Sequence, residues 1–200
     1  MKLSNVIFDI GCVLVSCDWT SYLHSFGFDR ETEAAVVKAV FWGPYWKEVD
    51  RGVWSDDQIL EAFTSLAPAY RHEIKQVYTH ADRSITGLSY ARPWIQELKS
   101  RGLRVYYLSN YGKELRRRTA DALNFLDLMD GGLFSYEAKE IKPEKPIYLE
   151  LMRRYPEILP EESVFIDDSE PNIITARELG LHGIVFQNQA QAISELEKLI

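Results

Sequence analysis

The chain has 200 residues, of which 46% are hydrophobic and 26% charged. This composition is typical of a globular protein that buries a core without disulfide support. Asp and Glu number 30 against 23 Lys and Arg, and the net charge of -7 argues against a broad surface for nucleic acid. No apolar stretch reaches the roughly 20 residues that a membrane span needs. Asp9 and Gly11 interrupt the first apolar run, which therefore does not resemble a secretory signal. Together with the two cysteines, this predicts a cytoplasmic protein without a membrane partner.

The first predicted element is a buried strand at residues 6–8, which ends at Asp9. Residues 18–88 then place apolar side chains three or four positions apart and contain no second convincing strand. Four helices are predicted there, at residues 20–26, 31–41, 58–66 and 74–82. We interpret residues 16–88 as an inserted helical cap, and residues 1–15 with 89–200 as the main domain.

Strands and helices alternate along the rest of the chain. The pattern predicts strands at 104–108, 133–136, 163–166 and 183–186, and helices at 93–102, 113–123, 145–155 and 171–180, before a terminal amphipathic helix. Such alternation predicts an α/β fold with a doubly wound parallel sheet. Ligands bind such sheets beyond the carboxyl ends of the strands, where this chain carries Asp9, Ser109 with Asn110, and Asp167 with Asp168.

Four short segments carry a resemblance to a known family. They read FDIGCVL from Phe8, LSN from Leu108, IKPE from Ile141 and FIDDS from Phe165. In order and spacing they resemble the four motifs of the haloacid dehalogenase-like hydrolase superfamily, each at a strand end or in the adjoining loop. The resemblance implies a Rossmann-like core with an inserted four-helix cap. Within the family, the opening motif is most similar to that of bacterial sugar-phosphate phosphatases.

The resemblance also implies a nucleophile and a metal site. Asp9 would attack phosphorus and form an aspartyl-phosphate. A Mg²⁺ ion prefers oxygen ligands, which the carboxylate of Asp9 and the main-chain carbonyl of Gly11 would supply together with one of the pair Asp167 and Asp168. The family pattern favours Asp168 of this pair. Asn172 matches a position that supports the metal through water.

Three further residues match positions that hold the transferring phosphoryl group. The Ser109 hydroxyl, the main-chain N–H of Asn110 and the Lys142 ammonium would donate to its oxygens. Ser109 and Asn110 are equally typical of a turn, and the role of Lys142 depends entirely on the resemblance. Asp9 could likewise be a turn residue, although a carboxylate directly after a buried strand is costly without a role.

The sequence departs from the family pattern at Gly11. Many phosphatases of this family carry there an aspartate that acts as general acid and base, which contributes about 10²- to 10⁴-fold to the rate. The leaving group could be intrinsically good, another residue could substitute, or the protein could bind without turnover. Asp18 and His24 are candidates for a substitute, but Asp18 is better explained as a helix cap and His24 as a helix-surface residue.

The cap segment is rich in aromatic residues, which is typical of sugar recognition when a few polar groups lie beside them. Tyr45, Trp46 and Glu48 are the candidates for substrate binding. The alternative is that these rings form the core of a small helical bundle.

These observations predict a Mg²⁺-dependent phosphatase that hydrolyses a small phosphorylated metabolite, such as the sugar phosphate glucose 1-phosphate, through Asp9. One alternative is a haloacid dehalogenase, which displaces halide without a metal. Clustered carboxylates at Asp167 and Asp168 argue against it, because they favour a cation. Another alternative is a catalytically weak family member that binds a phosphorylated ligand or a protein, since Gly11 replaces the acid/base residue.

Overall fold

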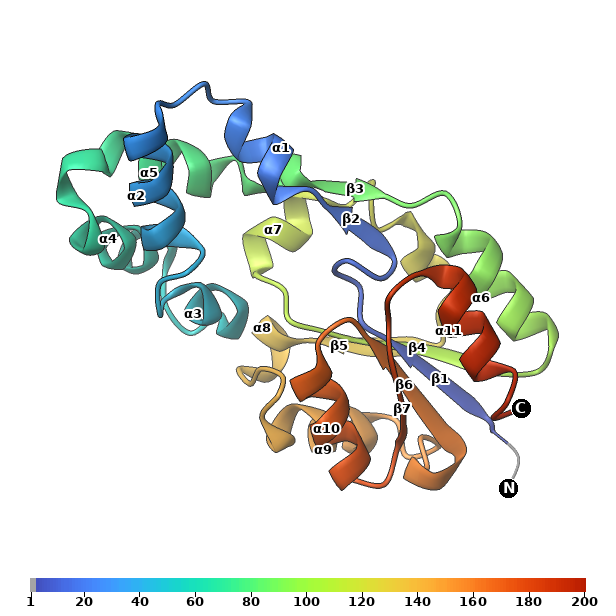
Figure 1. Ribbon diagram of the computed structural model, residues 1–200. Coiled ribbons are helices and arrows are strands. Elements are labelled where there is room, and N and C mark those ends of the chain that lie inside the picture. Colours follow the sequence, from blue (N-terminus) through green and yellow to red (C-terminus); the bar gives the residue numbers. More distant parts are fainter. Residues whose placement is uncertain (1–2) are drawn as a thin grey trace.

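A computed structural model describes residues 3–200 of the chain (Figure 1). Five parallel strands form one sheet in the order β5-β4-β1-β6-β7. They are β1 (Asn5–Phe8), β4 (Arg104–Ser109), β5 (Gly131–Phe134), β6 (Ser163–Asp167) and β7 (His182–Val185). The central strand β1 is hydrogen-bonded on both sides, and its residues are fully buried. The predicted α/β fold with a parallel sheet is confirmed.

Both faces of the sheet are covered by helices. Along β1, Val6 and Phe8 face a cluster that includes Trp94, whereas Ile7 faces a second cluster that includes Tyr148. The covering helices are α6 (Ala91–Ser100), α9 (Lys145–Arg154), α10 (Glu170–Glu178) and α11 (Gln189–Leu196), whereas α7 (Lys113–Arg118) and α8 (Ser135–Ala138) follow β4 and β5 at the carboxyl edge of the sheet. Because helices cover both faces, the inner strands β1 and β6 are buried along their whole length, as expected for a doubly wound sheet.

The cap is a helical layer that extends away from the sheet (Figure 1). Its elements are α1 (Trp19–His24), α2 (Arg30–Val40), α3 (Trp46–Arg51), α4 (Asp56–Leu66) and α5 (Arg71–Thr79), with 3-10 turns at Pro68–Tyr70 and Ala81–Ser84. Phe63, Ile74 and Val77 belong to a hydrophobic cluster of the cap itself. The short helix α3 was not among the four predicted helices. The division of the chain at residues 16 and 88 stays a prediction.

A two-stranded antiparallel sheet joins the cap to the core. It pairs β2 (Val15–Cys17) with β3 (Ile85–Gly87). The prediction that residues 18–88 contain no strand is therefore wrong at β3. Three-residue strands are too short to show alternation, and these two pair across about 70 residues of sequence. The cap thus enters and leaves the core through adjacent strands.

Among the predicted boundaries that differ from the structure, two have a clear local reason. The helix predicted at 113–123 ends at Arg118, and the chain turns into a 3-10 segment at Asn124–Leu128. At this end the Thr119 hydroxyl donates to the carbonyl of Leu115 (2.8 Å), a side-chain bond that competes with helix continuation. The strand predicted at 133–136 runs from Gly131 to Phe134, because Ser135 already begins α8. None of the helices in residues 3–200 has both the length and the apolar character that crossing a bilayer requires.

Candidate active site

The carboxyl ends of two neighbouring strands, β1 and β6, bring the predicted acidic residues together. Phe8 of β1 is in register with Ile166 of β6, so Asp9 follows one strand where Asp167 ends the other. One carboxylate oxygen from each of Asp9, Asp167 and Asp168 lies within 4.8 Å of the other two. The parallel register therefore builds an acidic cluster at one edge of the sheet.

Lys142 lies between two of these carboxylates. Its Nζ is 2.9 Å from Oδ1 of Asp9 and 2.6 Å from Oδ2 of Asp167, and the residue is only 3% exposed. Asn110 positions the lysine, because its Oδ1 accepts from the Lys142 N–H (2.8 Å) and its Nδ2 donates to the Lys142 carbonyl (2.9 Å). The sequence predicted a main-chain role for Asn110 and missed this role of its side chain.

The charges of this cluster oppose one another. Burial, the largest cause, raises the pKa of Asp9, Lys142 lowers it and Asp167 raises it, and together these effects bring the pKa to about 6. Burial also works against the charge of Lys142, but Asp167 and Asp9 outweigh it and raise the pKa of the ammonium. A single ammonium is thus surrounded by more negative charge than it can balance, a condition that favours a bound cation.

The structure distinguishes the two aspartates after β6. Asp167 is fully buried, and its oxygens accept from Lys142, from the Ser169 N–H (2.8 Å) and from Nδ2 of Asn172 (2.9 and 3.0 Å). Asp168 is exposed, and its carboxylate accepts no hydrogen bond from any other residue among residues 3–200. Asp168 therefore has free oxygens for a cation, whereas Asp167 and Asn172 are engaged with each other and with Lys142.

Ser109 and Gly11 flank the acidic cluster. The Ser109 hydroxyl is close enough to Asp9 to lower its pKa, yet its buried Oγ has no hydrogen-bond partner of good geometry among residues 3–200. A buried polar atom without a partner indicates a place for a ligand oxygen. Gly11 lies in the loop after β1, where an added Cβ would meet only Sγ of Cys17, at 3.7 Å. The donor set of Asp9, Asp168 and a main-chain carbonyl fits a hard divalent cation.

The predicted substrate residues have structural partners in the cap. The ring of Trp46 lies 5.4 Å from that of Trp19 and 6.4 Å from that of Phe63, within the cap cluster. The ring of Tyr45 is 5.8 Å from Trp54, and Glu48 lies 3.6 Å from Nε of Arg51. Packing within the cap explains most of the contacts of the Trp46 ring, in agreement with the alternative that these rings form the core of a helical bundle.

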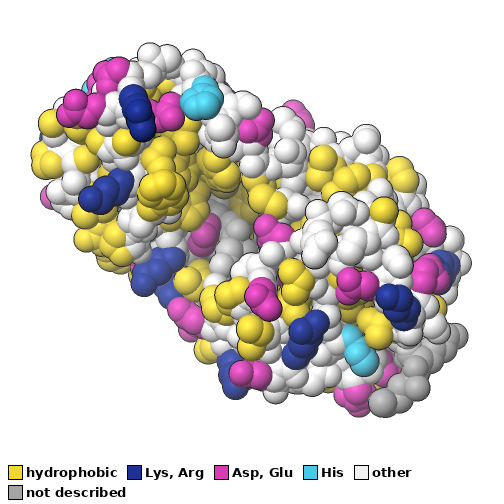
Figure 2. Space-filling view, in the orientation of Figure 1, with side chains coloured by type: hydrophobic (Ala, Val, Ile, Leu, Met, Phe, Trp, Pro, Cys, Tyr) yellow, Lys and Arg dark blue, Asp and Glu magenta, His cyan; other side chains and the backbone are white. Residues whose placement is uncertain are grey.

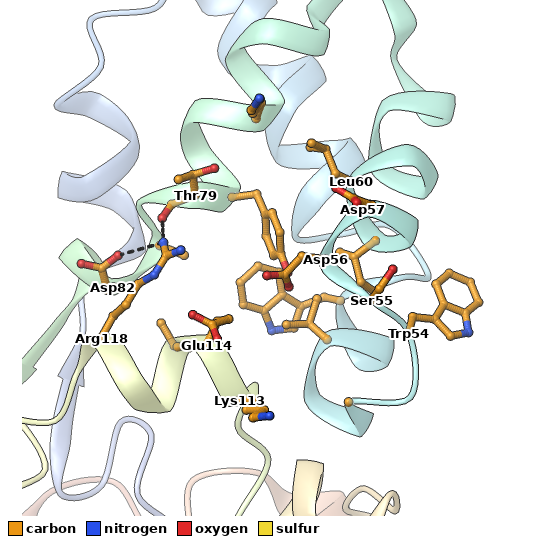
Figure 3. Close-up of a pocket in the computed structure, with 18 residues that line it drawn as sticks. Trp54, Ser55, Asp56, Asp57, Leu60, Thr79, Asp82, Lys113, Glu114 and Arg118 are labelled. Carbon is orange, nitrogen blue, oxygen red and sulfur yellow. Dashed lines mark hydrogen bonds and ion pairs between the residues drawn. The ribbon is translucent and has the colours of Figure 1, made fainter.

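Two pockets adjoin the cap. One, of about 400 Å³, lies between the cap and α7, where Arg118 reaches Thr79 and Asp82 (Figure 3). The other, of about 680 Å³, is a groove on α1 and α2. Its lining is mainly apolar and includes Trp42, and we call it the apolar groove. Figure 2 shows hydrophobic side chains gathered on the cap beside the hollow between cap and core.

The two candidates for a substitute acid have other roles. Asp18 caps α1, because its Oδ1 accepts from the Ser21 N–H at 2.9 Å. His24 has a side chain that is 65% exposed and lies 3.5 Å from Glu33 on the cap surface. Both observations confirm the structural interpretations of these residues.

Comparison with known proteins identifies the family. A model described as haloacid dehalogenase-like hydrolase matches residues 29–180. The chain belongs to this hydrolase family. The matched region begins after Asp9 and does not include the opening motif. The position of Asp9 after β1, next to Asp167, supports the resemblance of that motif independently.

Individual relatives of this hydrolase are distant. The chain is 22% identical to a sesquiterpene phosphatase of Aspergillus oryzae, over 97% of this chain and 95% of the relative. It is 27% identical to a drimenol cyclase of Aspergillus calidoustus over 97% of its own length, but it spans only 36% of the cyclase. A family enzyme of Bacteroides thetaiotaomicron, solved with magnesium and inorganic phosphate, shares the fold with a TM-score of 0.73 at 20% identity, covering 96% of this chain and 99% of that one.

Magnesium is expected to stabilise the protein in a pH-dependent way. The raised pKa of Asp9 means that protonation of its carboxyl stabilises the metal-free fold at low pH, and that this contribution is lost as the pH rises through about 6. Protons and metal compete for Asp9, so millimolar Mg²⁺ should raise the Tm clearly at about pH 7.5 and little at about pH 5.

Thermal unfolding with and without Mg²⁺ measures this effect. Asp168→Asn should abolish the shift, and Asp57→Asn, an exposed acid of the cap, should retain it. An equal shift at both pH values, or a shift that survives Asp168→Asn, would contradict the assignment.

Proposed function

We propose that this hydrolase is a Mg²⁺-dependent phosphatase that acts on a small phosphate monoester through an aspartyl-phosphate on Asp9. The observation that carries the proposal is the acidic cluster around Lys142 next to the unpartnered Ser109 hydroxyl. Oxygen ligands for a cation and donors for an anion lie at one strand edge. A phosphate monoester needs both.

The protein residues have distinct parts in the proposed reaction. An oxygen of Asp9 attacks phosphorus, and the bond from phosphorus to the leaving oxygen breaks. Lys142 and Ser109 donate to the phosphoryl oxygens, with the main-chain N–H of Asn110 as a third donor. Water then attacks phosphorus, and Asp9 and inorganic phosphate are released.

A magnesium ion would be held by the carboxylates of Asp9 and Asp168 and by the Gly11 carbonyl. When bound, it supplies positive charge that neutralises the phosphate oxygens. Asp167 is the positioning residue for Lys142, and Asn172 in turn holds Asp167. This arrangement keeps the ammonium directed at Asp9.

The substrate class has two candidates. A sugar phosphate such as glucose 1-phosphate is supported by the resemblance of the opening motif and by the polar and aromatic groups at Tyr45 and Glu48. A phosphate of an apolar alcohol is supported by the groove on α1 and α2, whose lining is mainly apolar, and by the likeness to a sesquiterpene phosphatase. The chemistry at Asp9 is the same for both.

Replacement of the nucleophile tests the proposed reaction. Asp9→Asn should lower Mg²⁺-dependent phosphate release by at least about 10³-fold, because an amide oxygen is a poor nucleophile. The assay is phosphate release from a panel that includes glucose 1-phosphate and a sesquiterpenyl monophosphate. No release by the wild type above the Asp9→Asn background would contradict the proposal and favour a binding protein, and metal-independent halide release from a 2-haloacid would favour a dehalogenase.

A groove variant distinguishes the two substrate classes. Trp42 is 81% exposed and lines the apolar groove, so Trp42→Ser should leave the fold intact. If the groove binds the alcohol, KM for an apolar alkyl phosphate should rise about tenfold, from the loss of apolar burial, while KM for glucose 1-phosphate is unchanged. Steady-state kinetics measure both, and equal effects on the two substrates would contradict a role for the groove.

A further inference from the structure

An alcohol leaves phosphorus poorly unless its oxygen receives a proton. The groups around Asp9 do not provide one, because Lys142 and Asp167 pair with each other and Asp168 is assigned to the cation. The loop after β1 has Gly11, and Asp18 and His24 have other roles. We propose that Asp50, near the carboxyl end of the cap helix α3, is the general acid and base of the reaction. This inference rests on the proposed phosphatase function.

The end of α3 is fixed to the core beside the acidic cluster. The Ser135 hydroxyl donates to the main-chain carbonyl of Asp50 (2.6 Å) and accepts from the N–H of Tyr111 (2.8 Å). Tyr111 comes two residues after Ser109. The backbone of Asp50 is thus tied, through one hydroxyl, to the segment that carries the proposed phosphoryl donors.

Ion pairs fix the same helix end to the loop that carries Lys142. Arg51 lies 2.7 Å from Glu144 and 3.4 Å from Glu140, residues on either side of Lys142. Its Nε also lies 3.6 Å from Glu48. Since these pairs involve Arg51, they hold the helix in place and leave the carboxylate of Asp50 free.

The surroundings of the Asp50 carboxylate fit a proton carrier. No hydrogen bond or ion pair occupies it among residues 3–200, and the residue is only partly exposed. The charges that act on it are those of Asp9, which raises its pKa, and Lys142, which lowers it. Together with burial, the largest cause, they bring the pKa of Asp50 to about 7. A group that titrates near neutral pH is suited to both giving and taking a proton.

The proton balance closes over one turnover. As the bond from phosphorus to the leaving oxygen breaks, protonated Asp50 gives its proton to that oxygen and the alcohol departs. The resulting carboxylate then takes a proton from the water that attacks phosphorus. Phosphate and the Asp9 carboxylate are released, and Asp50 is protonated again. No other reactant is needed.

The test compares leaving groups in Asp50→Asn. The leaving group of p-nitrophenyl phosphate departs without a proton. The leaving group of a simple alkyl phosphate needs a proton to depart. In the first turnover Asp50→Asn should release p-nitrophenolate at a rate near that of wild type. Steady-state turnover of both substrates, and first-turnover release of the alkyl alcohol, should fall by about 10²- to 10⁴-fold. Asp57→Asn on α4 is the matched control on the cap and should behave as wild type.

Rescue separates proton transfer from a merely structural effect. An aspartate at position 11 has room, because the nearest atom to its Cβ is Sγ of Cys17 at 3.7 Å. The double variant Gly11→Asp, Asp50→Asn should recover alkyl phosphate hydrolysis. Equal first-turnover losses for both leaving groups, or Asp50→Asn turnover equal to wild type, would overturn the role of Asp50 while the phosphatase function stands. A wild type without phosphate release would overturn the phosphatase function itself.

Discussion

The site depends on one buried ammonium between two buried carboxylates. Asp9 follows β1, and Asp167 ends the adjacent strand β6. Placing these two carboxylates close together would be strongly unfavourable without Lys142 between them. Removing one partner of such a pair costs about 3–5 kcal/mol, because the remaining charge is left buried. This is a large part of the 5–15 kcal/mol that typically stabilises a domain. The parallel sheet, the Asn110 amide and the Asn172 amide all serve to hold this group of charges in place.

The same cluster connects the core to the cap. Glu140 and Glu144 lie on either side of Lys142 in the sequence, and both form ion pairs with Arg51 of α3. The loop that carries Lys142 therefore also holds the cap helix in place. Ser135, the first residue of α8, makes a second connection to Asp50. The cap is therefore coupled to the chemistry by a few polar contacts, while the β2–β3 pair provides its covalent entry and exit. We expect a substrate that contacts the cap to affect the acidic cluster through α3.

Much of the core could be predicted from the sequence, because buried parallel strands are apolar runs that end in polar residues. Asp9, Ser109 and Asp167 mark three such ends, and the register brings them together. The short elements were harder. The strands β2 and β3 are stabilised by each other across the whole cap, and α3 has only six residues. Local periodicity is weak over such lengths.

Two features of the site depend on side-chain directions and long-range contacts that residue types alone do not determine, and the preference for Asp168 over Asp167 came from the family pattern. Asp167 and Asp168 are adjacent and chemically identical, and only the direction of each side chain determines which one meets Lys142. Asp50 lies outside the four predicted helices and has no distinguishing signal in the sequence, and its environment arises from long-range contacts of Ser135 and Arg51. Gly11 was the one available signal, because a substitute proton carrier was one of the three explanations that the missing aspartate left open.

The most direct test of the account is to trap the covalent intermediate on Asp9. The wild type is mixed with a phosphate monoester that it hydrolyses and Mg²⁺, quenched in acid during turnover, digested and examined by mass spectrometry. The account predicts that the peptide containing Asp9 gains the mass of one phosphoryl group, and that Asp9→Asn gains none. Turnover with an unmodified Asp9 peptide, or a phosphoryl group on another residue, would contradict it.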